Sequence, residues 1–320
     1  MATGYDGHFL AKTLLAGGVA GMTSKTAVAP LDRIKILLQA HKIGYKNHGV
    51  FSGLRAIIEK ERFLGLYRGN GAQMVRVFPY AAVQFLSFEI YKKHLTNLYG
   101  SGHSIKFFAG SLAGVTAVTM TYPLDLVRAR LAFITPDDLI TAKSDGKTIS
   151  LMERSMIINT LRQVYGQHGI RGLYRGLSPT LLAMIPHAGI SFYSFERLKH
   201  LVFTHFPQFC SRQKDGSIVL SFPAKLLCGG ISGAITQPII YPLDVARRRS
   251  QLATADAETR KYGGNPMRTL LTIYREHGII SGLYRGMSIN YIRAVPMVAV
   301  SFTAYEIMKQ SLGLNTGLSS

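Results

Sequence analysis

The feature that most constrains the fold of this chain is a unit that occurs three times along it. The triplet Pro-Leu-Asp stands at 30–32, 123–125 and 242–244, and a base follows each triplet at the same offset. Tyr-Arg-Gly triplets and aromatic-glutamate pairs follow in the same order in all three units. Markers that recur in one order three times indicate a triplicated unit of about a hundred residues. We expect the repeats to span 1–100, 101–210 and 211–320.

Each repeat is predicted to contain a first long helix, a polar loop, a short amphipathic helix and a second long helix. The first helices are expected at 9–40, 105–133 and 222–252, and the second at 72–97, 179–201 and 289–312. Each exceeds the roughly 20 residues that a bilayer span requires. Charged residues make up only 17% of the chain, and the mean hydropathy is +0.15. We therefore expect an all-α membrane protein with six transmembrane helices; a soluble helical protein is the alternative.

The chain is strongly basic, with 37 Lys and Arg against 17 Asp and Glu, a net charge of +20. Such an excess indicates an anionic partner: nucleic acid, lipid or a small molecule. Lys25, Arg76 and Arg293 interrupt apolar helices, where a lipid-facing charge would cost at least ~2.5 kcal/mol. We expect them to face a water-filled cavity, unpaired because no acid lies within four residues of any of them, and to bind an anionic substrate. A nucleic-acid-binding protein, the alternative class, would need its bases on a soluble surface.

No nucleophile, base and orienting group occur together, so we expect no enzyme activity and no catalytic residues. Two cysteines are too few for a zinc site, and we expect neither a metal nor a cofactor.

The carboxylate and base of each Pro-Leu-Asp motif lie on one helix face, after a proline that should kink the helix. One alternative is a local pair within each helix. Threefold symmetry would instead join each carboxylate to the base of the next repeat: Asp32 to Arg128, Asp125 to Arg247, and Asp244 to Lys35.

A similar set of charges ends the second helices: Glu89, Lys92, Glu196, Lys199, Glu306 and Lys309. Two rings that form alternately would act as gates on the two sides of a central cavity.

An asymmetric substrate must be recognised where the three repeats differ. At matching depths in the middle of the helices, some repeats have a cationic residue. Other repeats have a small, aliphatic, aromatic or amide side chain at the same depth. The expected substrate-binding residues are Lys25, Arg76, Tyr80, Ala183, Met184, His187, Gln237 and Arg293. The Tyr-Arg-Gly triplets precede the second helices, where backbone amides suit a lipid phosphate. The expected lipid-binding residues are Arg68, Gly69, Arg175, Gly176, Arg285 and Gly286.

Pro-x-Asp-x-x-Lys/Arg, a short amphipathic helix and then Tyr-Arg-Gly, three times over, resembles the mitochondrial carrier family across nearly the whole chain. The resemblance implies six transmembrane helices in threefold pseudosymmetry in the inner mitochondrial membrane, with the short helices on the matrix side. It also implies alternating access, cardiolipin at the short-helix sites and function as a monomer. Both termini would face the intermembrane space, and no cleaved presequence is expected.

In that family a glutamine braces the matrix-side ring and a tyrosine braces the opposite ring. Gln39 and Gln251 match the glutamine, whereas Ala132 does not, and Tyr305 matches the tyrosine. The chain departs from the family pattern at Arg62, which replaces a glycine, and at His168 and His277, which replace acids.

Three segments most resemble the coenzyme A carrier branch: 28–41, 65–79 and 282–296. The resemblance therefore implies transport of coenzyme A or a related adenine-containing phosphorylated cofactor. An adenine nucleotide or ATP-Mg/phosphate exchanger is the alternative within the family.

Overall fold

A computed structural model describes residues 7–42, 44–45, 48–100, 102–135, 153–212, 218–253, 255 and 259–313. It is a bundle of long helices, as predicted. The long helices are α1 (Gly7–Ala27), α2 (Ala29–Gln39), α4 (Asn70–Tyr99), α5 (His103–Phe133), α8 (Leu177–His205), α9 (Phe222–Leu252) and α11 (Met287–Ser311). Three shorter helices follow the first helix of each repeat: α3 (Val50–Gly65), α7 (Glu153–Leu173) and α10 (Pro266–His277).

The first predicted helix, 9–40, is divided in the structure. Val28 leaves the helical region between α1 and α2, with φ −98° and ψ 2°. Pro30 follows at the start of α2, where the missing N–H of proline costs no hydrogen bond. Pro123 and Pro242 lie inside the uninterrupted helices α5 and α9, so the same motif breaks the helix in one repeat only.

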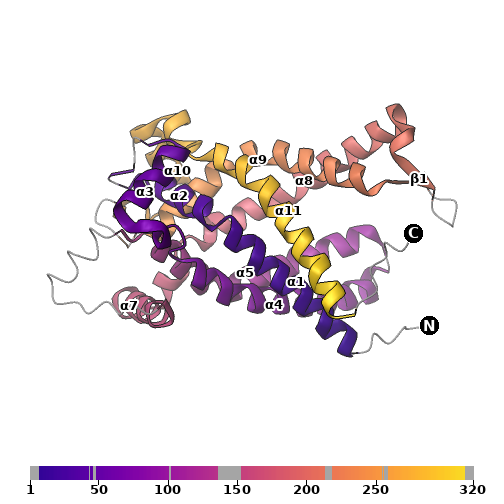
Figure 1. The fold of residues 1–320 in the computed structure, drawn as a ribbon, viewed down its shortest axis with the longest axis horizontal. Helices are drawn as coiled ribbons and strands as arrows, with labels where there is room; N and C mark the ends of the chain where they lie inside the picture. Colours follow the sequence, from indigo (N-terminus) through magenta and orange to yellow (C-terminus); the bar gives the residue numbers. More distant parts are fainter. Residues whose placement is uncertain are drawn as a thin grey trace.

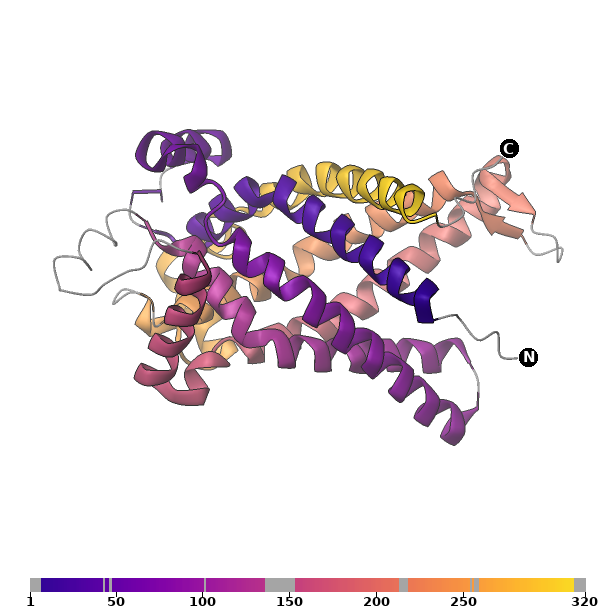
Figure 2. The ribbon, with the colours of Figure 1, turned by 60° about the horizontal axis from the view of Figure 1, so that its bottom comes forward.

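The long helices run along the long axis of the molecule (Figures 1 and 2), and their contacts close into a ring. The second helix of each repeat packs along the first helix of the next: α4 along α5, α8 along α9 and α11 along α1. The last contact joins the end of the chain to its beginning, and Lys12 donates a hydrogen bond to the carbonyl of Leu312 at 3.1 Å. The repeats therefore interlock cyclically.

The two ends of the bundle differ. One carries α3, α7 and α10, together with the turns η2 (Arg260–Tyr262) and η3 (Ile279–Leu283), and we call it the short-helix end (Figure 1). The opposite end, the hairpin end, carries η1 (Pro207–Phe209) and an antiparallel pair, β1 (Cys210–Arg212) and β2 (Ile218–Leu220), in which Cys210 lies opposite Leu220. The sequence patterns did not predict this hairpin.

The outer surface of the bundle is apolar, with side chains such as Leu86, Ile185 and Val295 largely exposed. By length and hydropathy alone, two of the described helices qualify as membrane spans, Ser104–Phe133 and Pro223–Leu252. Outward apolar and inward polar faces are typical of a helix bundle around an aqueous cavity in a membrane.

Candidate functional site

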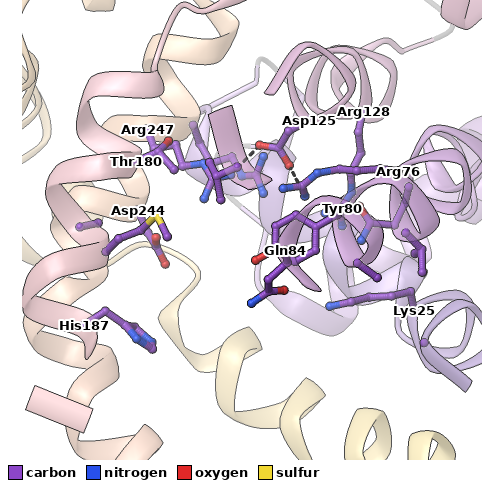
Figure 3. A pocket seen from close by; sticks show the side chains of 18 of the residues that line it. Lys25, Arg76, Tyr80, Gln84, Asp125, Arg128, Thr180, His187, Asp244 and Arg247 are labelled. Atoms are coloured by element: carbon purple, nitrogen blue, oxygen red, sulfur yellow. Dashed lines mark hydrogen bonds and ion pairs between the residues drawn. The ribbon is translucent and has the colours of Figure 1, made fainter. Parts of the chain in front are cut away.

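A central cavity of about 610 Å³ lies between the long helices. Seven of the eight predicted substrate-binding residues line it: Lys25, Arg76, Tyr80, Ala183, Met184, His187 and Arg293. The eighth, Gln237, does not; its amide lies 3.5 Å from the Asp244 carboxylate. Figure 3 shows Lys25, Arg76 and Tyr80 across the cavity from His187.

The cavity is electropositive, as its lining side chains show. Six are cationic and two are acidic: Lys25, Arg76, Arg128, Arg247, Arg248 and Arg293 against Asp125 and Asp244. Such an excess, between walls of low dielectric, attracts anions.

The expectation that the cavity cations lack acidic partners is wrong for two of the three. Arg76 donates to Asp125 at 2.9 Å, and Arg293 donates to Asp32 at 2.6 Å. These pairs join helices of different repeats, so a search within four residues along the chain could not find them. The third cation, Lys25, has no carboxylate within 4 Å among the described residues, and its Nζ lies 3.6 Å from the Met297 sulfur.

Below the cavity, at the short-helix end, two of the three expected inter-repeat pairs are present. Arg128 reaches Asp32 at 2.5 Å, and Arg247 reaches Asp125 at 2.6 Å. Each of these carboxylates therefore binds two guanidinium groups, one from the ring and one from the cavity wall. A buried carboxylate held in this way is well compensated.

The third expected pair, Asp244 with Lys35, is not formed. Lys35 instead lies over the ring of Tyr241, with Nζ 5.6 Å from the ring centre. A smaller polar cavity of about 130 Å³ touches both Lys35 and Asp244, and also Arg248, which the sequence patterns did not single out as a lining residue. The ring is therefore closed at two positions and open at the third.

The two matching glutamines make different contacts. Gln251 donates to Asp125 at 2.8 Å and to the Tyr122 hydroxyl at 3.2 Å, whereas Gln39 donates to the Tyr241 hydroxyl at 3.1 Å. Ala132 has no polar side chain to offer, as its sequence implied.

Tyr122 and Tyr241, which accept hydrogen bonds from the two glutamines, themselves donate to the Tyr-Arg-Gly motifs. Tyr122 donates to the carbonyl of Arg175, and Tyr241 to the carbonyl of Arg285. The ring is thus hydrogen-bonded to the starts of α8 and α11. Sequence reasoning missed this role, although both tyrosines directly precede their prolines.

At the hairpin end the charged ring is not formed between helices. Lys92 lies 3.5 Å from Glu89, and Lys199 lies 3.5 Å from Glu196, each pair within one helix. Lys309 lies over the ring of Tyr305, with Nζ 5.6 Å from its centre, and no ion pair joins Glu306 to Lys309. Each of these contacts lies within one helix, and exposed pairs of this kind contribute little to stability, so they do not hold the helices together at the hairpin end.

The glycines of the three Tyr-Arg-Gly motifs cap α4, α8 and α11. Gly69, Gly176 and Gly286 have φ of 85°, 89° and 79°, a conformation that favours glycine. Gly69 also has no room for a side chain: a Cβ there would lie 3.0 Å from the backbone nitrogen of Ala132, in the next repeat.

Two arginines of these motifs already have protein partners. Arg68 contacts Glu61 at 3.3 Å and the carbonyl of Ile134 at 3.2 Å, and Arg175 donates to the carbonyl of Gly263 at 3.2 Å. The helix-start amides, rather than free arginine side chains, are therefore the stronger candidate for binding a lipid phosphate.

A histidine pair links repeat 1 to repeat 3 at the short-helix end. The His41 ring stacks on the His277 ring with centres 4.1 Å apart, and Nε2 of His41 lies 2.9 Å from the carbonyl oxygen of Ser281. Burial and the nearby Arg249 lower the pKa of His41 to about 3. The ring is therefore neutral, and Nε2–H donates to that carbonyl. From the sequence alone, His277 was notable only because it replaces an acidic residue of the family pattern.

The comparisons with known proteins agree with this geometry. The family profile described as "Mitochondrial carrier protein" matches residues 6–99, 101–206 and 219–316. The chain is 50% identical over 310 residues to the Homo sapiens protein "Solute carrier family 25 member 16", covering 95% of this chain and 89% of the relative. It is 42% identical over 309 residues to the Arabidopsis thaliana "Mitochondrial carrier protein CoAc1", covering 94% and 89%.

The repeats, the inter-repeat carboxylate–arginine pairs and these similarities lead to one assignment. The chain belongs to the mitochondrial carrier family, a family of multi-pass transporters of the inner mitochondrial membrane that are not enzymes.

Proposed function

We propose that this carrier transports coenzyme A, or a closely related adenine-containing phosphorylated cofactor, by alternating access. The observation that carries the proposal is an electropositive cavity that places Lys25 and Arg76 across from α8, where Ala183 and Met184 form an apolar surface. The names of the relatives, among them the plant carriers called CoAc1, support the same substrate class.

The cationic side suits a substrate with several phosphate charges. Arg76 and Arg293 present planar guanidinium groups that can bind phosphate oxygens in bidentate fashion. Lys25 adds a point charge that no carboxylate neutralises in this conformation. Coenzyme A carries a diphosphate and a 3′-phosphate, enough charge for all three cations.

The opposite wall suits the adenine ring. Ala183 is small and leaves space at the cavity surface, and Met184 offers a polarisable apolar contact. His187 lies one helical turn further on, within reach to stack on a flat ring.

The shared carboxylates supply a way for substrate binding to open the short-helix end. Asp125 holds both Arg76 and Arg247, so a phosphate that takes Arg76 removes one of the partners that keep Asp125 in place. Asp32 stands in the same relation to Arg293 and Arg128. A ligand shifts an equilibrium only if it binds the two conformations differently, and this competition provides such a difference.

The two charged rings are proposed as the gates of this cycle. The short-helix-end gate comprises Asp32, Lys35, Gln39, Asp125, Arg128, Asp244, Arg247 and Gln251. The hairpin-end gate comprises Glu89, Lys92, Glu196, Lys199, Tyr305, Glu306 and Lys309. In the family's orientation these ends face the matrix and the intermembrane space.

Uptake by the purified protein in liposomes tests the substrate. Initial rates would be compared for coenzyme A, ADP, ATP-Mg and phosphate, with protein-free liposomes as the blank and with each compound preloaded inside in turn. The highest kcat/KM is expected for coenzyme A. A higher kcat/KM for ADP or ATP-Mg would favour the nucleotide-exchanger alternative, and no coenzyme A uptake under any preload would overturn the proposal.

A further inference from the structure

A second, largely apolar pocket of about 320 Å³ opens between α4 and α5. Its lining residues are Ala81, Gln84, Phe85, Phe88, Gly110 and Ala113. Ala81 and Gln84 also line the central cavity, so the two spaces adjoin each other at these residues. We call this space the side pocket.

The side pocket extends from the phosphate-binding level toward the hairpin end. Twelve residues separate Arg76 from Phe88 along α4, a rise of about 18 Å. On α5, Gly110 lies one turn from Gly114, and a Cβ on Gly114 would approach the Met184 side chain at 3.3 Å. Because Met184 lines the central cavity, this face of α5 is turned inward rather than toward lipid.

The equivalent place between α8 and α9 is closed. There Ser191 stands where repeat 1 has Gln84, and Ser232 stands where repeat 2 has Ala113. Ser232 donates to the carbonyl oxygen of Ser191 at 2.6 Å, and this bond ties the two helices together. Ala113 has no donor to make that bond, so the α4–α5 pair differs here from the α8–α9 pair.

Gln84 provides the polar group of the side pocket. Its side-chain amide makes no hydrogen bond with any of the described residues, although the amide can both donate and accept. Figure 3 shows Gln84 between Tyr80 and Lys25, with its amide end in the cavity. An amide-containing ligand would satisfy both of its functions.

We propose that the side pocket binds the pantetheine arm of a coenzyme A-type substrate, an inference that rests on the function proposed above. The arm is attached to the diphosphate and contains two amides, two methyl groups on one carbon and a terminal thiol. Its phosphate end meets the cationic wall, its methyl groups face Phe85 and Phe88, and one of its amides pairs with Gln84. The arm thereby distinguishes coenzyme A from nucleotides, which lack it.

Inhibition of labelled coenzyme A uptake in liposomes tests the side pocket. Unlabelled coenzyme A is compared with adenosine 3′-phosphate 5′-diphosphate, which keeps the adenine and all three phosphate groups but lacks the arm. In the wild type, coenzyme A should inhibit at a concentration about tenfold lower, a difference of about 1.4 kcal/mol. Gln84→Leu should reduce this ratio to about one or two by weakening coenzyme A alone.

A second variant fills the side pocket. Gly110→Leu is expected to fit at its Cβ, whose closest neighbour would be Phe88 at 3.9 Å, and to occupy the space beyond it. Gly229→Leu is the matched control, at the same position of repeat 3, where a Cβ meets nothing within 4 Å. Gly110→Leu should raise the KM for coenzyme A about tenfold, and Gly229→Leu less than twofold.

The outcomes are separable. A wild-type ratio retained in Gln84→Leu, with an unchanged KM in Gly110→Leu, overturns the side-pocket proposal while leaving coenzyme A transport intact. If Gly110→Leu and Gly229→Leu both stop uptake altogether, the inhibition ratio measured in Gln84→Leu alone decides whether the side pocket binds the arm. Added lipid could also change the uptake rate differently in Gln84→Leu or Gly110→Leu than in the wild type. If it does so while the inhibition ratio stays at its wild-type value, the pocket binds a lipid acyl chain and the proposal is overturned. Failure of the proposed function shows itself differently, as a wild type that takes up no coenzyme A.

Discussion

Arg62 holds a backbone conformation that the other two repeats give to glycine. Its φ and ψ are 61° and −180°, close to those of Gly169 (61°, −159°) and Gly278 (71°, −165°). A side chain in this region costs on the order of 1–3 kcal/mol. Arg62→Gly should therefore raise the free energy of unfolding by about 1 kcal/mol, after allowing for the greater unfolded-state entropy of glycine.

Thermal unfolding in detergent measures this change, and Gly169→Arg is the mirror-image control. A Cβ on Gly169 meets nothing within 4 Å, so that variant reports backbone strain alone and should lower the melting temperature. A lower melting temperature for Arg62→Gly would show that the Arg62 side chain contributes more than the strain costs.

The two cavity arginines should be essential for uptake. Arg76→Ala and Arg293→Ala each remove a charge-assisted phosphate contact of about 2–3 kcal/mol, so initial uptake should fall about 30-fold or more. Arg55→Ala is the control, since Arg55 is exposed on α3 and pairs only with Glu59. Coenzyme A uptake at the wild-type rate after loss of both arginines would contradict the site assignment.

The neutral His41 ring makes stability depend on pH. The unfolded chain protonates this histidine near pH 6.5, whereas the folded chain does so only near its lowered pKa of about 3. Protons therefore favour unfolding, and the stability that a neutral His41 provides is lost as the pH falls from about 6.5 toward 3. The charged and titratable groups around the ring are Arg249, Glu276, His277 and Arg285.

Melting temperatures at pH 7.5 and 5.5 test this. The wild type should lose more stability on acidification than His41→Gln, while His94→Gln, at an exposed histidine of α4, should behave like the wild type. Equal losses in all three proteins would exclude the His41 ring as the cause.

At the scale of elements, the ion pair between α5 and α9 can be tested by exchanging its charges. Asp125→Lys should abolish uptake, because it places a cation beside Arg76 and Arg247. Adding Arg247→Asp restores an opposite-charge pair between the helices and should recover part of the activity. The matched control adds Arg128→Asp instead, which restores a pair within α5 but removes one partner of Asp32, so no recovery is expected from it. Recovery in that control alone would mean that local pairs are the ones that matter.

The helices and the symmetric pairs Asp32–Arg128 and Asp125–Arg247 were predictable because their signals repeat, whereas partners that do not repeat were not. Three copies of each motif defined the long helices to within a few residues. The contact of Arg76 with Asp125 spans 49 residues, and that of Arg293 with Asp32 spans 261. Such pairs depend on how helices cross, which no local pattern encodes. The side pocket was missed for the same reason, since it depends on which residue of α5 faces Gln84.

The single break between α1 and α2 also lay beyond the sequence. All three first helices carry the same proline, yet Val28 alone leaves the helical region, while Pro123 and Pro242 lie in continuous helices. The residue before the proline differs between the repeats. Ala29 precedes Pro30, whereas Tyr122 and Tyr241 precede the other two prolines and hydrogen-bond to the Tyr-Arg-Gly motifs.

At the scale of the whole molecule, we expect cardiolipin to stabilise the carrier by binding at the starts of α4, α8 and α11. A ligand that binds only the folded state adds about 2.7 kcal/mol at a hundred times its Kd. Titration of the detergent-solubilised protein with cardiolipin should therefore raise its melting temperature. Phosphatidylglycerol at equal charge is the control, and an equal shift with that lipid would show that only negative charge is sensed.

The contact of α11 with α1 makes the repeats a closed circle, although the chain that forms it is linear. Lys12 of α1 and Leu312, which directly follows α11, are hydrogen-bonded to each other, so the ring has no structural first repeat. Its ends could therefore be moved. A circular permutant opened between α4 and α5, with its present ends joined by a flexible linker, would keep every contact between neighbouring repeats. Such a permutant would change the order in which the repeats are synthesised while leaving their packing unchanged.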